Sequence, residues 1–166
     1  MARQLWLLRH AEAEPHGTRA DAQRRLTERG EQQARAAGLA LTQLAASFEL
    51  ILFSPKVRAS QTAELAAEGW SDQARSLMSV HEELAGGFEA GQALELLAGL
   101  GEDARLLLVG HEPDLSRVVG DLTGGRIDLK KGGVAIVRLE GAGGELVALV
   151  RPRELALIAG VPGGGH

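Results

Sequence analysis

Short apolar runs recur along the chain and are separated by longer stretches rich in Ala, Gln and Leu. Apolar runs without alternation are typical of strands that are buried on both faces of a parallel sheet. These runs predict strands over residues 4–8, 50–53, 77–80 and 105–109. The stretches between and after them predict helices over residues 27–47, 55–68, 90–100 and 113–122.

Two further β-rich runs, over residues 134–139 and 145–150, are separated by the glycine-rich segment 141–144, which predicts a hairpin. Strands that alternate with helices along a chain form parallel sheets, because each helix returns the chain to the same edge. The fold class expected is therefore α/β: a three-layer α/β/α sandwich with a mostly parallel central sheet and an antiparallel edge hairpin.

Two of the helices begin at recognisable capping residues. Thr27 is expected to be the N-cap of the first helix, which tolerates Gly30 in its early turns. Ser54 and Pro55 are expected to be a capping serine and a proline at the first helical position. This start would place Arg58 about one turn into the helix, facing back toward the end of the preceding strand.

The length and composition fit one globular domain. The chain has 166 residues, of which 45% are hydrophobic, and this is enough for one core. We expect a single domain over residues 1–159, a loose glycine-rich tail over residues 160–166, and a monomer. There is no cysteine, which excludes disulfides, thiolate zinc sites and a cysteine nucleophile.

Several kinds of partner and location are not expected. No apolar stretch approaches the ~20 residues of a membrane span, and no signal peptide is recognisable, so we expect a cytoplasmic protein. The net charge of −4 and the absence of tyrosine argue against nucleic acid. No cluster of His, Asp and Glu has the spacing of metal ligands, so neither metal nor cofactor is expected. Lys130 and Lys131 are interpreted as a solvated turn or as a rim of a pocket.

Basic residues follow three of the apolar runs. Arg9 and His10 follow the first, Arg58 comes soon after the second, and His111 follows the fourth. Ligands of open α/β sheets bind at the carboxyl ends of the strands, so these residues are expected to share one crevice. Guanidinium groups bind phosphate through paired donors, and a neutral imidazole can attack phosphorus.

The sequence therefore predicts phosphoryl chemistry with His10 as the nucleophile. Arg9 and Arg58 would clamp the phosphoryl oxygens, and His111 would donate to one of them.

Four ordered motifs surround these positions. They are LRHAEA at residues 8–13, LTERG at 26–30, SPKVRASQTA at 54–63 and VGHEP at 109–113. In this order the chain resembles the histidine phosphatase (phosphoglycerate mutase-like) superfamily, and most closely its short SixA-like branch of phosphohistidine phosphatases. The resemblance implies a phosphatase with a phosphohistidine intermediate and assigns one phosphate pocket to Arg9, His10, Arg58 and His111.

The resemblance also places a candidate general acid in the segment 82–87. Glu83 is this candidate, with its neighbour Glu82 as the alternative. An acid is needed to protonate the leaving group of a phosphate ester. A phosphohistidine needs less help because its leaving ring can already be protonated, so an acid at this position is not a requirement of the SixA-like branch.

Two departures from the mutase-like members bear on the substrate. Those members carry Ser and Asn where this chain has Ala13 and His16, and they carry long insertions that cap the active site, for which this chain has no room. An open pocket would admit a phosphorylated histidine on a helix of a partner protein. We therefore expect the protein to remove phosphate from phosphohistidine in a partner of the histidine-phosphotransfer type. The alternatives are hydrolysis of a small phosphomonoester and phosphate recognition without catalysis.

Overall fold

A six-stranded sheet in the order β3-β2-β4-β1-β5-β6 forms the centre of the computed structural model, which describes residues 2–44, 46–141 and 143–162. The strands are β1 Arg3–Arg9, β2 Leu50–Phe53, β3 Met78–Val80, β4 Arg105–Gly110, β5 Val134–Glu140 and β6 Gly143–Val150. Strands β1 to β4 are parallel, and β5 and β6 form an antiparallel hairpin at one edge. The predicted mostly parallel sheet with an antiparallel edge hairpin is confirmed.

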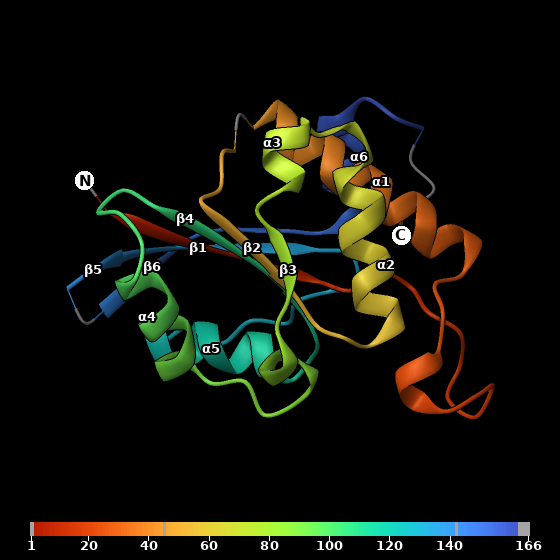
Figure 1. The fold of residues 1–166 in the computed structure, drawn as a ribbon, viewed down its shortest axis with the longest axis horizontal. Coiled ribbons are helices and arrows are strands. Elements are labelled where there is room, and N and C mark those ends of the chain that lie inside the picture. Colours follow the sequence, from red (N-terminus) through yellow and green to blue (C-terminus); the bar gives the residue numbers. More distant parts are fainter. Residues whose placement is uncertain (1, 45, 142, 163–166) are drawn as a thin grey trace.

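Helices cover both faces of this sheet (Figure 1). One layer contains α1 Glu28–Gln43, α2 Val57–Ala66 and α6 Pro152–Ala159, and the other contains α4 Ala90–Ala98 and α5 Asp114–Thr123. Side chains of a strand alternate between the two faces. Accordingly Leu5 and Leu7 pack in the α4/α5 layer, whereas Trp6 and Leu8 pack in the α1/α2/α6 layer. The expected three-layer sandwich is confirmed.

The register of the parallel strands brings their carboxyl ends to one level. Arg9 at the end of β1 pairs with Gly110 at the end of β4, and Phe53 at the end of β2 pairs with Val109. The chain leaves all three strands at the same edge of the sheet. The residues that follow, His10, His111 and Ser54, are therefore neighbours.

Close packing explains two glycines of α1. Thr27 is the N-cap of this helix, as expected, and its Oγ1 accepts a hydrogen bond from the Gly30 N–H. A Cβ on Gly30 would lie 1.9 Å from the Glu12 carbonyl oxygen, and a Cβ on Gly38 would lie 1.8 Å from that of Ala66. Both glycines therefore allow α1 to approach neighbouring backbone, and Gly30 is a packing requirement rather than a tolerated residue.

The start of α2 differs from the prediction. The helix begins at Val57 after Lys56, no side chain caps it, and Ser54 and Pro55 precede it. The reason is that Ser54 is completely buried and its hydroxyl contacts His111 on the neighbouring strand end. Ser54 is a residue of the strand-end cluster and not a helix cap.

Other boundaries also differ. The first helix ends at Gln43 instead of residue 47, and the expected loop 81–87 contains a short 3-10 helix, η3 Glu82–Ala85. Short elements that the apolar pattern does not reveal are η1 Asp21–Gln23, η2 Ala67–Gly69 and α3 Asp72–Arg75, and the pattern also misses α6. Most of the expected tail, residues 163–166, lies outside the described residues. Gly160 ends α6 with a φ of 72°. In the described segments, none of the helices is long and apolar enough to cross a membrane.

Candidate active site

The ends of β1, β2 and β4 bring the predicted phosphate residues together. The rings of His10 and His111 have centroids 5.3 Å apart. His10, Arg58 and His111 retain only 6%, 5% and 7% of their exposure, although all three are polar. Buried polar groups need partners, so the contacts of each ring and guanidinium define what the site can do.

The tautomer of His10 is set by the backbone. Its Nδ1 lies 2.8 Å from the carbonyl oxygen of Ala11, which can only accept, so Nδ1 carries the proton and donates. In the neutral ring Nε2 then keeps its lone pair. Burial lowers the pKa of His10 to about 3. The hydrogen bond to Ala11 opposes this shift, whereas His111 and Arg58 lower the pKa further. At neutral pH the ring is thus uncharged, with the lone pair of Nε2 unprotonated.

His111 is oriented by Ser54. The Ser54 Oγ accepts a hydrogen bond from the Lys56 N–H at 3.2 Å, and His111 Nε2 lies 2.7 Å from the same oxygen. The hydroxyl hydrogen is thus available to Nε2, and this arrangement favours a proton on Nδ1. Within the described residues, Nδ1 is buried and has no hydrogen-bond partner. Burial and the cations Arg58 and Lys56 lower the pKa of His111 to about 3.

Arg58 extends from the first turn of α2 into the site and contacts Asp21. Its Nη1 donates to the Asp21 carbonyl oxygen at 2.8 Å, and its Nη2 lies 3.3 Å from Asp21 Oδ2. Burial lowers the pKa of Arg58, and the carboxylate of Asp21 opposes this effect. The guanidinium remains charged, because arginine is protonated at any physiological pH.

Arg9 reaches the site from the end of β1. Its Nη1 donates to the carbonyl oxygen of Leu129 at 2.9 Å, while its Nε is buried without a hydrogen-bond partner among the described residues. Burial lowers the pKa of Arg9, and the acids Glu112 and Asp128 oppose this. The backbone contact fixes the guanidinium and leaves donor capacity for an anion.

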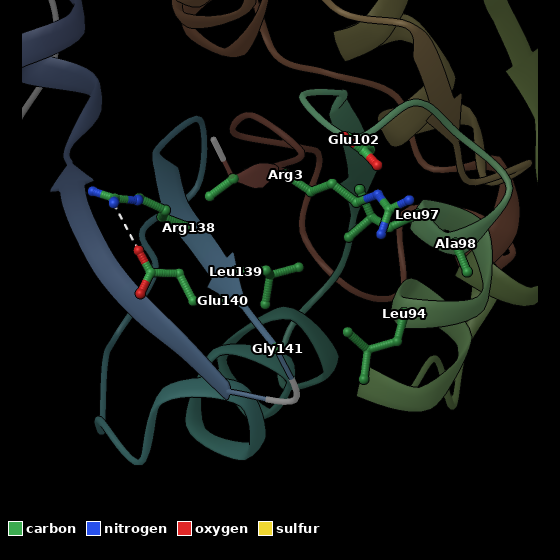
Figure 2. A pocket seen from close by; sticks show the side chains of 10 residues that line it. Arg3, Leu94, Leu97, Ala98, Glu102, Arg138, Leu139, Glu140 and Gly141 are labelled. Atoms are coloured by element: carbon green, nitrogen blue, oxygen red, sulfur yellow. Dashed lines mark hydrogen bonds and ion pairs between the residues drawn. The ribbon is translucent and has the colours of Figure 1, made fainter.

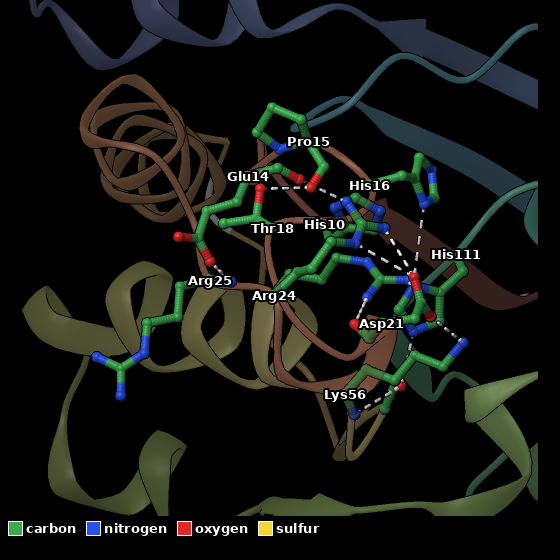
Figure 3. Close-up of polar contacts among 12 residues, drawn as sticks. His10, Glu14, Pro15, His16, Thr18, Asp21, Arg24, Arg25, Lys56 and His111 are labelled. Atoms are coloured by element: carbon green, nitrogen blue, oxygen red, sulfur yellow. Dashed lines mark hydrogen bonds and ion pairs between the residues drawn. The ribbon is translucent and has the colours of Figure 1, made fainter.

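Asp21 is a member of the site that sequence reasoning missed. Its carboxylate lies 3.0 Å from Arg24, 3.3 Å from Lys56 and 3.8 Å from His16, in addition to Arg58. Figure 3 shows this carboxylate among those side chains, next to His111. Hydrogen bonds from Arg24 and Lys56 hold the pKa of Asp21 well below its usual range. Three cations at this edge of the sheet, Arg24, Lys56 and Arg58, thus gather around one carboxylate, as they would around a phosphate.

The remaining residues of the matching motifs hold the loops together. The Thr62 Oγ1 accepts from the Ala11 N–H at 3.0 Å and donates to the Arg58 carbonyl oxygen at 2.7 Å. The Gln61 Oε1 accepts from the Leu26 N–H at 2.8 Å. Both side chains therefore tie α2 to the segment after β1, which fixes the separation of His10 and Arg58.

Glu83 lies in η3, after β3, and its carboxylate is engaged elsewhere. It accepts a hydrogen bond from Gln92 and lies 3.8 Å from His81 Nε2. No contact within the described residues joins it to Arg9, His10, Arg58 or His111. The structure brings those four residues together and leaves Glu83 at the same edge of the sheet, with its side chain 59% exposed.

A separate hollow of about 740 Å³ lies at the other end of the sheet. It is lined by the start of β1, the end of α4 and the hairpin, and Figure 2 shows Arg138 and Glu140 paired at its edge. None of its lining residues is a histidine, and Arg3 is held by the carbonyl oxygens of Leu100 and Gly101. This hollow therefore lacks the imidazoles that the strand-end site provides.

Acidic and imidazole side chains do not assemble into a cation site in the part of the chain that the structure describes. No group of three or more His, Asp or Glu residues there has the arrangement of metal ligands. The predicted phosphate site is built from cations and neutral imidazoles, a donor set that binds anions.

Comparison with known proteins assigns this arrangement to a family. Residues 5–105 match the histidine phosphatase superfamily (branch 1). The chain belongs to the histidine phosphatase superfamily. It is also 34% identical over 146 residues to an uncharacterised protein of Picosynechococcus sp., a match that covers 81% of this chain and 84% of that protein. The resemblance found in the sequence motifs is confirmed, and with it the general prediction of a phosphatase of this superfamily.

Solved structures of the superfamily share the fold. The protein histidine phosphatase SixA complexed with tungstate matches with a TM-score of 0.79 and 24% identity, covering 92% of this chain and 99% of that one. A SixA protein from Nakamurella multipartitia matches with a TM-score of 0.75 and 26% identity, covering 92% and 97% of the two chains. The chain therefore has the length and architecture of the short SixA-like members.

Proposed function

We propose that this histidine phosphatase superfamily member works through phospho-His10, without a metal, and that its substrate is phosphohistidine in a partner protein. The observation that carries the proposal is the state of the His10 ring. Its Nδ1 proton is committed to the Ala11 carbonyl oxygen, and burial keeps the ring neutral. The lone pair on Nε2 is then available for in-line attack on phosphorus.

The reaction has two displacements. In the first, a bond forms between phosphorus and His10 Nε2 while the bond to the substrate's ring nitrogen breaks; the substrate ring leaves as neutral imidazole and keeps the proton on its other nitrogen. The phosphorylated His10 ring is then a cation, and its Nδ1–H still donates to Ala11. In the second, water attacks phosphorus, the bond to Nε2 breaks, and dihydrogen phosphate leaves with neutral His10.

Three side chains around His10 stabilise the transferring group. Arg9 and Arg58 bring guanidinium donors to the equatorial oxygens, and His111 brings its Nδ1–H. Charge builds on these oxygens in the transition state, and one such donor in a buried site typically contributes about 3 kcal/mol. Burial of Arg58 and His111 strengthens these contacts because water screens them poorly.

The edge of the sheet supports a protein substrate. The segment between β2 and β3 forms α2, η2 and α3. Helix α2 packs against α1 and also contacts η1, β2 and β4, and η2 packs against α1 and α2. Helix α3 precedes the amino end of β3, away from the strand ends that carry His10 (Figure 1). A histidine displayed on another protein can therefore approach this edge.

A small phosphomonoester remains the alternative substrate. It requires an acid for the leaving oxygen, and Glu83 lies at the correct edge of the sheet, close to His81. Gln92 holds this carboxylate, and among the contacts of the described residues none joins it to His10. A phosphohistidine makes no such demand on Glu83, which favours the protein substrate.

The test is phosphate release in EDTA from a histidine-phosphorylated carrier domain and from a panel of small phosphomonoesters. The proposal predicts that the carrier is hydrolysed with the higher kcat/KM and that His10→Ala abolishes the reaction. Activity that depends on added metal, or full activity of His10→Ala, would overturn the mechanism. A preference for small esters would leave the mechanism unchanged and identify a small phosphomonoester as the substrate.

A variant pair separates the two substrate classes further. Glu83→Gln is expected to leave hydrolysis of the phosphorylated carrier within about twofold of the wild type, as for other exposed substitutions. Glu82→Gln is its matched control in the same short helix. A loss of about 100-fold on a small phosphomonoester in Glu83→Gln alone would identify Glu83 as the general acid of ester hydrolysis.

A further inference from the structure

A strongly basic groove adjoins the phosphate site. It is a cavity of about 490 Å³ between the end of β1, α1, the turn before β5 and the start of α6. Its charged lining residues are the cations Arg9, Arg29, Lys130, Lys131, Arg151 and Arg153 and the single acid Glu12. Six of the chain's 18 lysines and arginines thus line one groove of a protein whose net charge is −4.

This groove is continuous with the site of chemistry. Arg9 belongs to both, because it ends β1 directly before His10 and also lines the groove. The turn that carries the two lysines is fastened to the same strand end: the Gly132 N–H donates to the carbonyl oxygens of Arg9 and His10, at 3.1 and 3.0 Å. A substrate whose phosphoryl group lies at His10 therefore has its flanking groups next to the groove.

The cations of the groove are mostly exposed, and two of the exposed ones are unpaired among the described residues. Lys130 lies 2.6 Å from Asp128, and Arg151 lies 2.6 Å from Glu154. Lys131 and Arg153 form no ion pair with any residue in the described segments. The side chains of Lys130 and Arg151 are 56% and 62% exposed. Positive charge on this surface is thus not balanced by the protein itself.

We infer that this basic groove docks an acidic segment of the polypeptide that carries the phosphohistidine. The inference rests on the proposed function and adds a feature of the partner: aspartates and glutamates close to the phosphorylated histidine. Exposed cations on long side chains suit carboxylates spread along a surface, whereas a second phosphate of a small substrate calls for convergent, buried donors. Opposite charges at such a surface speed association and select the partner.

Charge reversal at the two unpaired cations tests the docking surface. The variant Lys131→Glu/Arg153→Glu removes groove charge without touching the residues of the phosphate site. Its matched control is Arg117→Glu/Arg126→Glu, which makes the same change in net charge on α5 and just beyond its end. Arg117 and Arg126 are exposed and lie outside the groove.

The probes are two peptides that contain a stable phosphohistidine analogue, one flanked by glutamates and one by serines. Dissociation constants are measured by fluorescence anisotropy at low and high salt, so the test does not depend on turnover. The wild type and the control variant are expected to bind the acidic peptide about tenfold more tightly at low salt, as a few exposed ion pairs would give. The groove variant is expected to lose this preference, and high salt is expected to weaken it in the wild type.

The outcomes separate this inference from the proposed function. Equal affinity of the wild type for the two peptides, or the same preference in the groove variant, would overturn the docking surface even if phosphohistidine is hydrolysed. Tighter binding of a small bisphosphate than of the acidic peptide would assign the groove to a small substrate and also overturn it. Hydrolysis of the phosphorylated carrier with EDTA present reports on the proposed function alone.

Discussion

The hydroxyl oxygen of Ser54 lies 2.7 Å from Nε2 of His111. These residues follow the neighbouring strands β2 and β4, so this contact joins the two strand ends at the predicted phosphate site. Ser54 is completely buried and also accepts from the Lys56 N–H. One hydroxyl thereby fixes both the ring of His111 and the entry into α2. In the proposed mechanism Ser54 is a positioning residue, because it would act on the phosphoryl group through His111.

Replacing Ser54 by alanine tests this role. Ser54→Ala leaves Nε2 of His111 without its partner, and we expect kcat/KM to fall about tenfold and stability to fall by about 1 kcal/mol. Ser60→Ala is the matched control, since Ser60 lies nearby on α2 and donates to a backbone carbonyl, that of Val57. Ser54→Thr, which keeps the hydroxyl, is expected to recover part of the activity. Wild-type kcat/KM in Ser54→Ala would show that His111 does not depend on Ser54.

The neutral imidazoles make stability depend on pH. The pKa values of His10 and His111 are lowered from 6.5 to about 3, first by burial and then by neighbouring cations. As the pH falls from 6.5 toward 3, the unfolded chain binds protons at these positions and the folded protein does not. Stability contributed by the two neutral rings is therefore full above pH 6.5 and is lost as the pH falls through this window.

Urea unfolding at pH 7, 5 and 4 measures this linkage. The wild type is expected to lose more free energy of unfolding over the range than His10→Asn/His111→Asn, because the variant lacks the two titrating rings. The carboxylates titrate in both proteins and cancel in the comparison. Equal losses in the two proteins, or an NMR titration of His10 near pH 6.5, would contradict the neutral, buried state of the nucleophile.

The carboxylate of Asp21 contacts Arg58, one of the two arginines that the proposed mechanism assigns to the phosphoryl group. Asp21→Asn removes its charge while keeping a side chain that can still accept from Arg24 and Arg58. We expect phosphate and vanadate to bind about threefold to tenfold more tightly to this variant, as removal of one exposed competing charge would give. Thermal shift with increasing anion concentration measures the affinity. Asp72→Asn, at an exposed ion pair on α3, is expected to have no effect. Weaker anion binding in Asp21→Asn would show that Asp21 positions Arg58 and does not compete.

Close packing of α1 against α2 depends on Gly38. A Cβ at this position would lie 1.8 Å from the Ala66 carbonyl oxygen, so Gly38→Ala must push the helices apart. We expect a destabilisation of about 3 kcal/mol, at the upper end for overpacking. Gly91→Ala in α4 is the matched control: no atom lies within 4 Å of its Cβ, and we expect a gain of about 0.5 kcal/mol. Urea denaturation measures both, and a Gly38→Ala protein as stable as the wild type would contradict the packing.

Sequence reasoning was most successful where one short segment carries the information. Uninterrupted apolar runs give the strands, and the polar residues directly after them give His10 and His111. The parallel order of the sheet then brings these residues to one edge without further information. Arg58 follows from the same logic, although its helix begins later than expected.

What the sequence did not reveal depends on contacts between distant segments. Ser54 next to Pro55 is a typical helix start. Only the packing of the neighbouring strand end shows that the Ser54 hydroxyl contacts His111 instead of capping the helix. Asp21 lies in a polar stretch with no periodicity, and its importance arises from the surrounding cations of other segments. Gly30 is explained only by the Glu12 carbonyl oxygen, which is distant in sequence.

The central claim is that the phosphoryl group is transferred to His10 before it is released as phosphate. A rapid acid-free quench followed by intact-protein and peptide mass spectrometry tests this claim most directly. On mixing with a phosphohistidine carrier, the account predicts a transient enzyme species with one added phosphoryl group, located on His10 and absent in His10→Ala. His81→Ala, which alters a histidine outside the site, is expected to form it normally. Turnover without a phosphoenzyme, or a phosphoryl group on His111 instead, would contradict the account.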